Sequence, residues 1–96
     1  MPTRYAMHVN TAGTNGTTGH HTISVYIRET MDDGTTLDGV VETFGIDSTA
    51  MESLYGGDIG KWRDWVAEEL LTRHKRRRLA HAEISQWMGK EFEIPS

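Results

Sequence analysis

One stretch of the sequence decides the fold: residues 61–88, which read KWRDWVAEELLTRHKRRRLAHAEISQWM. It contains neither glycine nor proline, and Gly89 follows it, where a helix commonly ends. A helix turns about 100° per residue, so its buried side recurs every three or four residues. An apolar stripe with this spacing begins with Trp62, Val66 and Leu70. The pattern predicts a long C-terminal helix that starts after Asp58, a typical N-cap residue.

The same stripe is interrupted by Arg73 and Arg77 and then returns in phase. Its second part consists of Ala80, Ile84 and Met88, with Trp87 at the edge. A continuous helix over residues 59–88 would be about 45 Å long. A globule of this chain length has a radius of gyration of about 12–13 Å and is therefore roughly 30 Å across. The helix is thus predicted to be longer than the domain that it packs on.

Two arrangements satisfy this length mismatch. Either the second half of the helix extends beyond the sheet, or the helix kinks near Arg76 and folds back over the sheet edge. No residue of the run 73–78 breaks a helix, which favours the first arrangement, although tertiary contacts can bend such a helix. An extended half would expose the apolar residues of the second stripe and would need a partner to cover them. The two arrangements stay open at this point.

The N-terminal half predicts β-strands. Alternating apolar residues indicate strands over residues 4–9, 22–30 and 35–46. Residues 10–19 contain no large apolar side chain and predict a long mobile hairpin loop, whereas Asp33-Gly34 predicts a tight turn with positive φ at both positions. The alternation of the third strand changes phase near Gly39, which predicts a bulge there.

These elements define an α+β class: a three-stranded antiparallel meander packed by a long C-terminal helix. Asp47 and Ser48 are N-cap residues for a short extra helix over residues 49–55, which Gly56-Gly57 would end. Near the C-terminus Phe92 and Ile94 alternate with two glutamates, so residues 91–94 are a candidate edge strand. The length of 96 residues corresponds to one domain, 1–96.

Composition excludes several classes of protein. The chain has no cysteine, which excludes a disulfide scaffold and any thiolate chemistry. No apolar region follows the first five residues, and no apolar run approaches the roughly 20 residues that span a bilayer. We therefore expect neither a signal peptide nor a membrane segment, and we expect a cytoplasmic protein.

Charge is distributed unevenly along the chain. Residues 1–60 hold two basic and eight acidic residues, a sum of −6, and residues 61–96 hold eight basic and six acidic residues, a sum of +2. The positive charge concentrates in residues 73–78, which we call the basic run. Its cations are the candidate residues for binding an anionic partner: Arg73, Lys75, Arg76, Arg77 and Arg78. The simpler interpretation is that they pair with the acidic half of the protein, within one molecule or across a dimer.

No catalytic or metal-binding motif is evident. His8 and His20 would share a strand face if the first two strands paired in register, but no third ligand is identifiable, so we expect no metal site. The glycines at positions 13, 16 and 19 match neither a P-loop nor a dinucleotide fingerprint, because no helix or lysine follows them. We expect no enzyme activity, no catalytic residue and no cofactor.

The sequence therefore predicts a small accessory or regulatory protein that acts by protein–protein binding. Its partner would be another protein or a second copy of the chain. The predicted interface residues are Trp65, Ile84, Trp87 and Met88. The alternative function is a nucleic-acid-binding module that uses the basic run, with tryptophan side chains as stacking surfaces.

Overall fold

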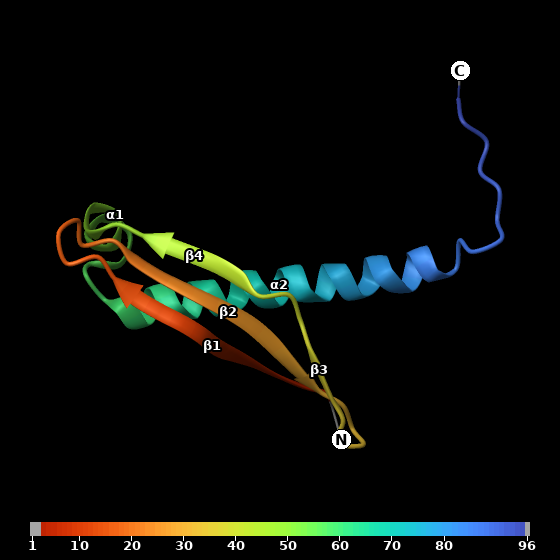
Figure 1. Cartoon of the computed structure of the whole chain (residues 1–96), viewed down its shortest axis with the longest axis horizontal. Helices are drawn as coiled ribbons and strands as arrows, with labels where there is room; N and C mark the ends of the chain where they lie inside the picture. The colour runs from red at the N-terminus through yellow and green to blue at the C-terminus, as the bar shows by residue number, and fades with distance from the viewer. Residues whose placement is uncertain (1–2, 96) are drawn as a thin grey trace.

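A computed structural model describes residues 3–95 and has the expected α+β architecture (Figure 1). The elements in chain order are β1 (Arg4–Thr14), β2 (His21–Thr30), β3 (Thr36–Asp38), β4 (Glu42–Ile46), α1 (Ser48–Tyr55) and α2 (Ile59–Ser85). Strand β2 is central: it pairs antiparallel with β1 along one edge and with both β3 and β4 along the other. Helix α2 packs along one face of this sheet. The structure thus confirms the antiparallel meander, the short helix and the long C-terminal helix.

The side chains of strand β2 point alternately to the two faces of the sheet. Val25 and Ile27 are buried beneath α2, as the alternating pattern predicts for a half-buried strand. The intervening side chains lie on the opposite face, which no helix covers (Figure 1). There Tyr26 stacks on His8, and Arg28 donates two hydrogen bonds to the Asp38 carboxylate. One face of the sheet is therefore apolar and covered, and the other is polar and open.

The predicted third strand is two strands rather than one. Asp38 of β3 lies opposite Arg28, and Glu42 of β4 lies opposite Val25, so two β2 residues face the three residues 39–41. The extra residue confirms the bulge predicted near Gly39, but the continuous strand over 35–46 is wrong. A Cβ atom on Gly39 would lie 2.6 Å from His74 Nδ1 of α2. Glycine is therefore required where α2 crosses the interruption.

The loop predicted over residues 10–19 is largely a strand. Strand β1 continues to Thr14, with an irregularity between Val9 and Thr11, and only a short turn joins it to β2. In that turn the Asn15 side chain accepts hydrogen bonds from the backbone N–H groups of Thr17 and Thr18. The prediction was wrong because the end of β1 is exposed on both faces. It therefore needs no large apolar residue, although its backbone pairs with β2.

The second hairpin turn also differs from its prediction. Gly34 has a φ of 87°, but no residue other than glycine has a positive φ in the described chain, so Asp33 does not. Asp33 instead accepts hydrogen bonds from the backbone N–H and the hydroxyl of Thr35. A tight primed turn requires positive φ at both central residues. Here only Gly34 has a positive φ, and the hydrogen bonds of the Asp33 side chain to Thr35 stabilise the turn instead.

Helix boundaries follow the capping residues closely. The Asp47 side chain accepts from the N–H of Ala50 at the start of α1, and left-handed Gly56 ends this helix. Asp58 caps α2 by accepting from the N–H of Gly60. Helix α2 runs without a break to Ser85, three residues short of the predicted end, and turns follow up to Gly89.

The extended arrangement of α2 is therefore the observed one, and the kink near Arg76 is wrong. Because the basic run contains no helix breaker, the backbone ladder continues through it. The radius of gyration is 18.0 Å, well above the roughly 12–13 Å of a compact chain of this length. In Figure 1 the second half of α2 projects past the sheet and leads to a separate C-terminal tail.

The hydrophobic core occupies only one end of the molecule. It consists of Val25, Ile27, Phe44, Ile46, Met51, Trp62, Val66 and Leu70. His74 is the last buried residue of α2, and every described residue from 75 onward is exposed. Residues 90–95, which we call the tail, form no strand, so the predicted C-terminal edge strand is absent from the described chain. None of the described helices is both long and apolar enough to cross a membrane.

Candidate protein-binding surface

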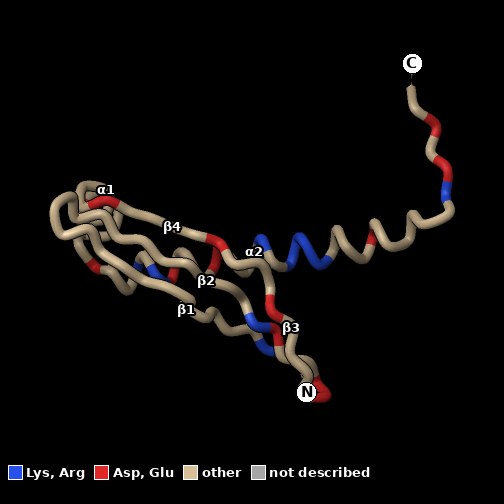
Figure 2. Tube along the Cα trace, in the orientation of Figure 1, with Lys and Arg blue, Asp and Glu red and all other residues tan. Residues whose placement is uncertain are grey.

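The basic run lies where α2 leaves the sheet, and Figure 2 shows its cations gathered there. Arg73 and Arg77 both point toward β4, where Glu42 Oε1 lies 3.6 Å from Arg73 Nη1 and 2.6 Å from Arg77 Nη2. Arg73 also donates to Glu69, one turn earlier on α2, at 3.0 Å. The second oxygen of Glu42 is buried and has no hydrogen-bond partner among residues 3–95. Two of the candidate cations are thus held by the sheet of their own chain.

A buried ionic cluster occupies the far end of the core. His74 Nε2 donates to Glu29 Oε1 at 2.9 Å, and Arg78 Nη2 donates to Glu29 Oε2 at 3.3 Å. Glu29 and His74 are only 4% and 5% exposed. The hydrogen bond from His74 is the main cause that holds the pKa of Glu29 below its usual range, and Arg78 adds to it against the effect of burial. Glu29 is therefore a buried carboxylate whose two oxygens both have partners.

Sequence reasoning missed Glu29, Glu42 and His74, although the sequence carried a signal for all three. Glu29 continues the inward alternation of β2 after Val25 and Ile27, and His74 follows Leu70 by four residues on the buried stripe of α2. Glu42 is likewise in phase with the buried Phe44 and Ile46 of β4. Charged residues and a histidine on the facing surfaces of a sheet and a helix are expected to lie close together.

The other two cations of the basic run have different surroundings. Lys75 Nζ lies 5.1 Å from the centre of the Tyr5 ring on β1, within the range of a cation–π contact. Arg76 forms no ion pair with any residue in the range 3–95. The structure thus shows pairing within one molecule for Arg73, Arg77 and Arg78, as the simpler interpretation of the charge pattern proposed. Of the five cations of the basic run, Lys75 and Arg76 are the two that have no carboxylate partner among residues 3–95.

Helix α2 and the sheet diverge beyond His74, and an open groove lies on each side of Arg78. One groove, of about 400 Å³, lies between β1 and α2 and includes Tyr5, Leu79 and Ala82. The other, of about 460 Å³, lies beside β3 and includes Leu37 and Val40. Charged and histidine side chains, among them Arg78 and His81, line both grooves beside these apolar residues. The grooves are therefore mixed in character, and their lining alone does not select a ligand.

The predicted interface residues fall into two separate places. Ile84 and Met88 are 54% and 90% exposed on the projecting part of the molecule, and Trp87 nearby contacts Phe92 of the tail edge-to-face at 5.7 Å. Trp65 lies 19 residues before Ile84, about 28 Å away along the helix. It is half-exposed and packs edge-to-face on Phe44 at 6.2 Å. The structure therefore brings three of the four residues together and leaves Trp65 apart.

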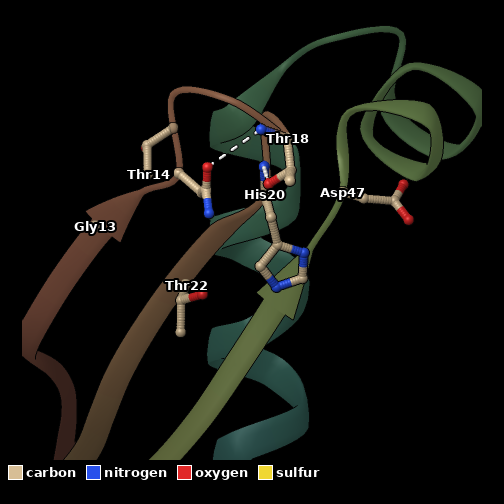
Figure 3. Close-up of a pocket in the computed structure, with 7 residues that line it drawn as sticks. Gly13, Thr14, Thr18, His20, Thr22 and Asp47 are labelled. Atoms are coloured by element: carbon tan, nitrogen blue, oxygen red, sulfur yellow. Dashed lines mark hydrogen bonds between the residues drawn. The ribbon is translucent and has the colours of Figure 1, made fainter.

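A third pocket, at the other end of the molecule, contains polar side chains of the kinds that catalytic sites use (Figure 3). It has a volume of about 540 Å³ between the β1–β2 turn and the start of α1, and it includes Thr14, His20 and Asp47. The Asp47 carboxylate points away from the His20 ring and caps α1. The Asn15 side chain, which also lines the pocket, is bonded to the backbone of its own turn. Within this pocket His20 and Asp47 therefore form no acid–base pair. The one hydroxyl–imidazole contact of a lining residue among residues 3–95 joins Thr14 Oγ1 to His21 Nδ1 at 2.8 Å, at an exposed position.

The histidines are likewise not arranged for a metal. His8 lies opposite Tyr26 in the middle of the sheet, whereas His20 lies in the β1–β2 turn, so the register separates them. No cluster of three histidine, aspartate or glutamate side chains among residues 3–95 is suited to hold an ion. The idea of a shared strand face for these two histidines is wrong.

Comparisons with known proteins give no relative from which a function could be transferred. No family model, no curated protein and no solved structure matches this chain. The function must therefore be argued from the geometry and chemistry of the chain itself.

Proposed function

We propose that this chain is a small cytoplasmic accessory or regulatory protein, without catalytic activity of its own, that acts by binding protein. The binding surface is the projecting end of α2 with the turn that follows it, and its apolar residues are Ile84, Trp87 and Met88. A second copy of the chain is the partner to which this proposal commits. The nucleic-acid-binding alternative would use the basic run instead.

The observation that carries the proposal is the exposed continuation of the buried stripe. Val66 and Leu70 are buried, and Ile84 follows in the same helical phase but is 54% exposed, with Met88 90% exposed in the turn just after α2. Exposed apolar groups on an isolated projecting helix gain free energy when a partner covers them, at roughly 25 cal/mol per Å². A helix that ended near His74 would suffice for the core, so the additional turns favour an intermolecular role.

Charge supports a protein partner over a nucleic acid. Three of the five cations of the basic run already neutralise Glu29 or Glu42, which leaves Lys75 and Arg76 for an external anion. Affinity for a polyanion grows with the number of phosphates that a protein neutralises, so two cations on a chain of net charge −4 give little. Residues 1–60 of a second copy carry eight acidic residues, which are candidate partners for the same two cations.

The test is the oligomeric state of the full chain and of the double variant Ile84→Glu/Trp87→Glu, measured by sedimentation at micromolar concentrations. We expect a dimer for the native chain and a folded monomer for the variant, because two carboxylates on the apolar surface oppose its burial. The matched control is Leu54→Glu, which changes an exposed apolar residue on α1 at the opposite end of the molecule. We expect this control to remain dimeric.

A native chain that sediments as a monomer at high micromolar concentration would contradict self-association through α2. The nucleic-acid alternative is tested in parallel with a labelled DNA duplex in about 150 mM salt. A shift at low micromolar protein that is lost in Arg76→Gln would favour nucleic-acid binding over protein binding.

A further inference from the structure

The outer edge of β1 is open along its whole length. Strand β1 has 11 residues and pairs only with β2 among the described elements. A long unpaired edge presents a row of backbone N–H and C=O groups on which another strand can form. Proteins usually protect such an edge with a covering helix or loop, a proline, charges or a bulge. No described strand pairs with this edge, β1 contains no proline, and its irregularity lies between Val9 and Thr11, so residues 4–9 keep a regular edge.

The helix-facing side of β1 is also incompletely covered. Tyr5, Met7 and Val9 lie on this side, because they are opposite Glu29, Ile27 and Val25 of β2. Met7 packs against the core, but Val9 is 55% exposed and Tyr5 is 40% exposed. Helix α2 runs along β2. Its His74 and Lys75 contact one side of the Tyr5 ring, whereas Val9 is left largely to solvent. A further strand beside β1 would bury them if it carried apolar residues on the same side.

The tail has the sequence that such a strand requires. Phe92 and Ile94 alternate with Glu91 and Glu93, and Pro95 follows, a residue that is tolerated at the end of an edge strand. The tail is exposed throughout, although it has one alternating apolar side. Within the described chain it belongs to no sheet, and its Phe92 ring lies against the nearby Trp87. The tail is thus a strand-like segment without a sheet.

Charges on β1 match those on the tail. If Phe92 and Ile94 pack beside Tyr5 and Val9, strand alternation places both tail glutamates on the open face of the sheet. The residues of β1 on that face include Arg4 and His8, and the adjacent β2 contributes Arg28. Opposite charges on neighbouring strands are stabilising, whereas like charges are destabilising. Both faces of a tail strand would therefore find complementary side chains on β1.

We propose that the tail of one copy adds as a strand to the free edge of β1 in a second copy. The exchange extends the sheet by one strand in each copy and covers Val9. This inference rests on the self-association proposed above and assigns it a second contact, distinct from the apolar surface of α2. Strand addition of this kind derives its affinity from main-chain hydrogen bonds and its specificity from alternate side chains.

Amide hydrogen exchange tests the strand directly. The N–H groups of β1 that point to the open edge become protected only when another strand pairs with them. We compare the full chain with a chain that ends at Gly89, which lacks the exposed residues 90–95 together with Ser96. We expect exchange of alternate β1 amides to accelerate at least tenfold in the shortened chain, while β2 amides stay unchanged. Equal β1 exchange in both chains would overturn the proposal.

Concentration separates exchange between copies from a tail that returns to its own sheet. We expect β1 protection in the full chain to fall on dilution together with the dimer fraction. Protection that does not change with dilution would overturn the second-copy assignment.

A peptide of residues 89–95 added to the shortened chain supplies the tail in trans. We expect it to restore β1 protection, and the matched control peptide with Phe92→Ser and Ile94→Ser to bind at least tenfold more weakly. Equal binding of the two peptides would show that the apolar side of the strand is not recognised and would overturn the proposal.

A charge exchange provides the specific rescue. Full chains with Glu91→Lys/Glu93→Lys should lose association, because the lysines would face Arg4. Mixing them with chains that carry Arg4→Glu should restore it in part.

If Ile84→Glu/Trp87→Glu abolishes dimerisation while the shortened chain still dimerises, the tail proposal fails and the α2 surface stands. The reverse result would retain the tail strand and remove the α2 surface.

Discussion

The apolar residues of the two halves of α2 share one helical phase, but those of the first half are buried and those of the second half are exposed. In residues 59–74 the apolar stripe is buried against β2 and β4, whereas in residues 75–85 every side chain is exposed. The backbone and the spacing of apolar residues do not change between the halves. The difference arises in the sheet, which diverges from the helix (Figure 1), so that His74 is the last buried residue of α2. Burial of an amphipathic helix is therefore decided by the length of its partner as much as by its own pattern.

The boundary between the halves is marked by charge. His74 is in phase with Val66 and Leu70, but it meets Glu29 instead of an apolar side chain. One turn later Arg77 and Arg78 reach back to carboxylates on the sheet. The basic run thus anchors the helix at its exit from the core, and the chain beyond it is free to bind elsewhere.

The sharpest test of this comparison is one substitution made in each half. Leu70→Ala removes a side chain that is 1% exposed, and we expect it to lower the free energy of unfolding by about 3–5 kcal/mol. Leu79→Ala removes the same atoms from a position that is 72% exposed, and we expect a change within about 0.5 kcal/mol. Urea denaturation, monitored by tryptophan fluorescence, measures both.

The comparison fails if Leu79→Ala costs as much as Leu70→Ala. That outcome would mean that the distal half is packed in solution. Repeating the Leu79→Ala measurement in the Ile84→Glu/Trp87→Glu background would then show whether the packing partner is a second copy.

The boundary cluster gives the next largest effect. Glu29→Gln keeps the shape of the side chain but removes the charge that His74 and Arg78 stabilise, so we expect a loss of about 1–3 kcal/mol near pH 7. The pH dependence has a definite sign, because the pKa of Glu29 is lowered in the folded state by the hydrogen bond from His74. This contribution is complete above the pKa of an unfolded glutamate, about 4.3, and is lost as the pH falls below it through the lower folded pKa.

Denaturation of the native chain and of Glu29→Gln between pH 3 and 7 checks this expectation. The two stabilities should converge as the pH falls, because the native carboxylate becomes protonated and resembles the amide. If the free energies of unfolding of the two chains differed by a constant amount over the whole pH range, the ionised form of Glu29 would not be the form that His74 and Arg78 stabilise. Asp64→Asn is a suitable control, since the ion pair of Asp64 with Arg63 is solvent-exposed.

Much of this fold is readable from the sequence, because its signals are local. Capping by Asp47 and Asp58, the alternation of β2 and the absence of breakers across the basic run predict their elements to within a few residues. The errors share a cause. The end of β1 and the division at Gly39 are set by backbone pairing and by the close approach of His74. The end of β1 leaves no hydrophobic pattern, and the phase change at Gly39 does not by itself distinguish a bulge from a division into two strands.

The candidate site was predictable only in part. The exposed apolar residues Ile84, Trp87 and Met88 follow from a helix that is too long for its domain, which is an argument from length. The partners of the basic run required the sheet register, because Glu29 and Glu42 lie 13 residues apart in sequence and bind different residues of α2. The open edge of β1 could not be predicted from the sequence, because it depends on the strand order and on the position of α2 along β2.

The smallest expected effect separates cations that anchor the helix from cations that are free. Arg77→Gln removes a 2.6 Å ion pair with Glu42 at the boundary, and such a half-exposed pair contributes only about 0–1 kcal/mol to the free energy of unfolding. Arg76→Gln, one residue earlier, removes a charge with no ion pair in residues 3–95, so its effect on stability should be still smaller. In association the order should reverse, because the cation that the fold does not use is the one available to a partner. Thermal unfolding and sedimentation at two salt concentrations measure both quantities. A larger loss of dimer in Arg77→Gln than in Arg76→Gln would indicate that the helix must be anchored before it can bind.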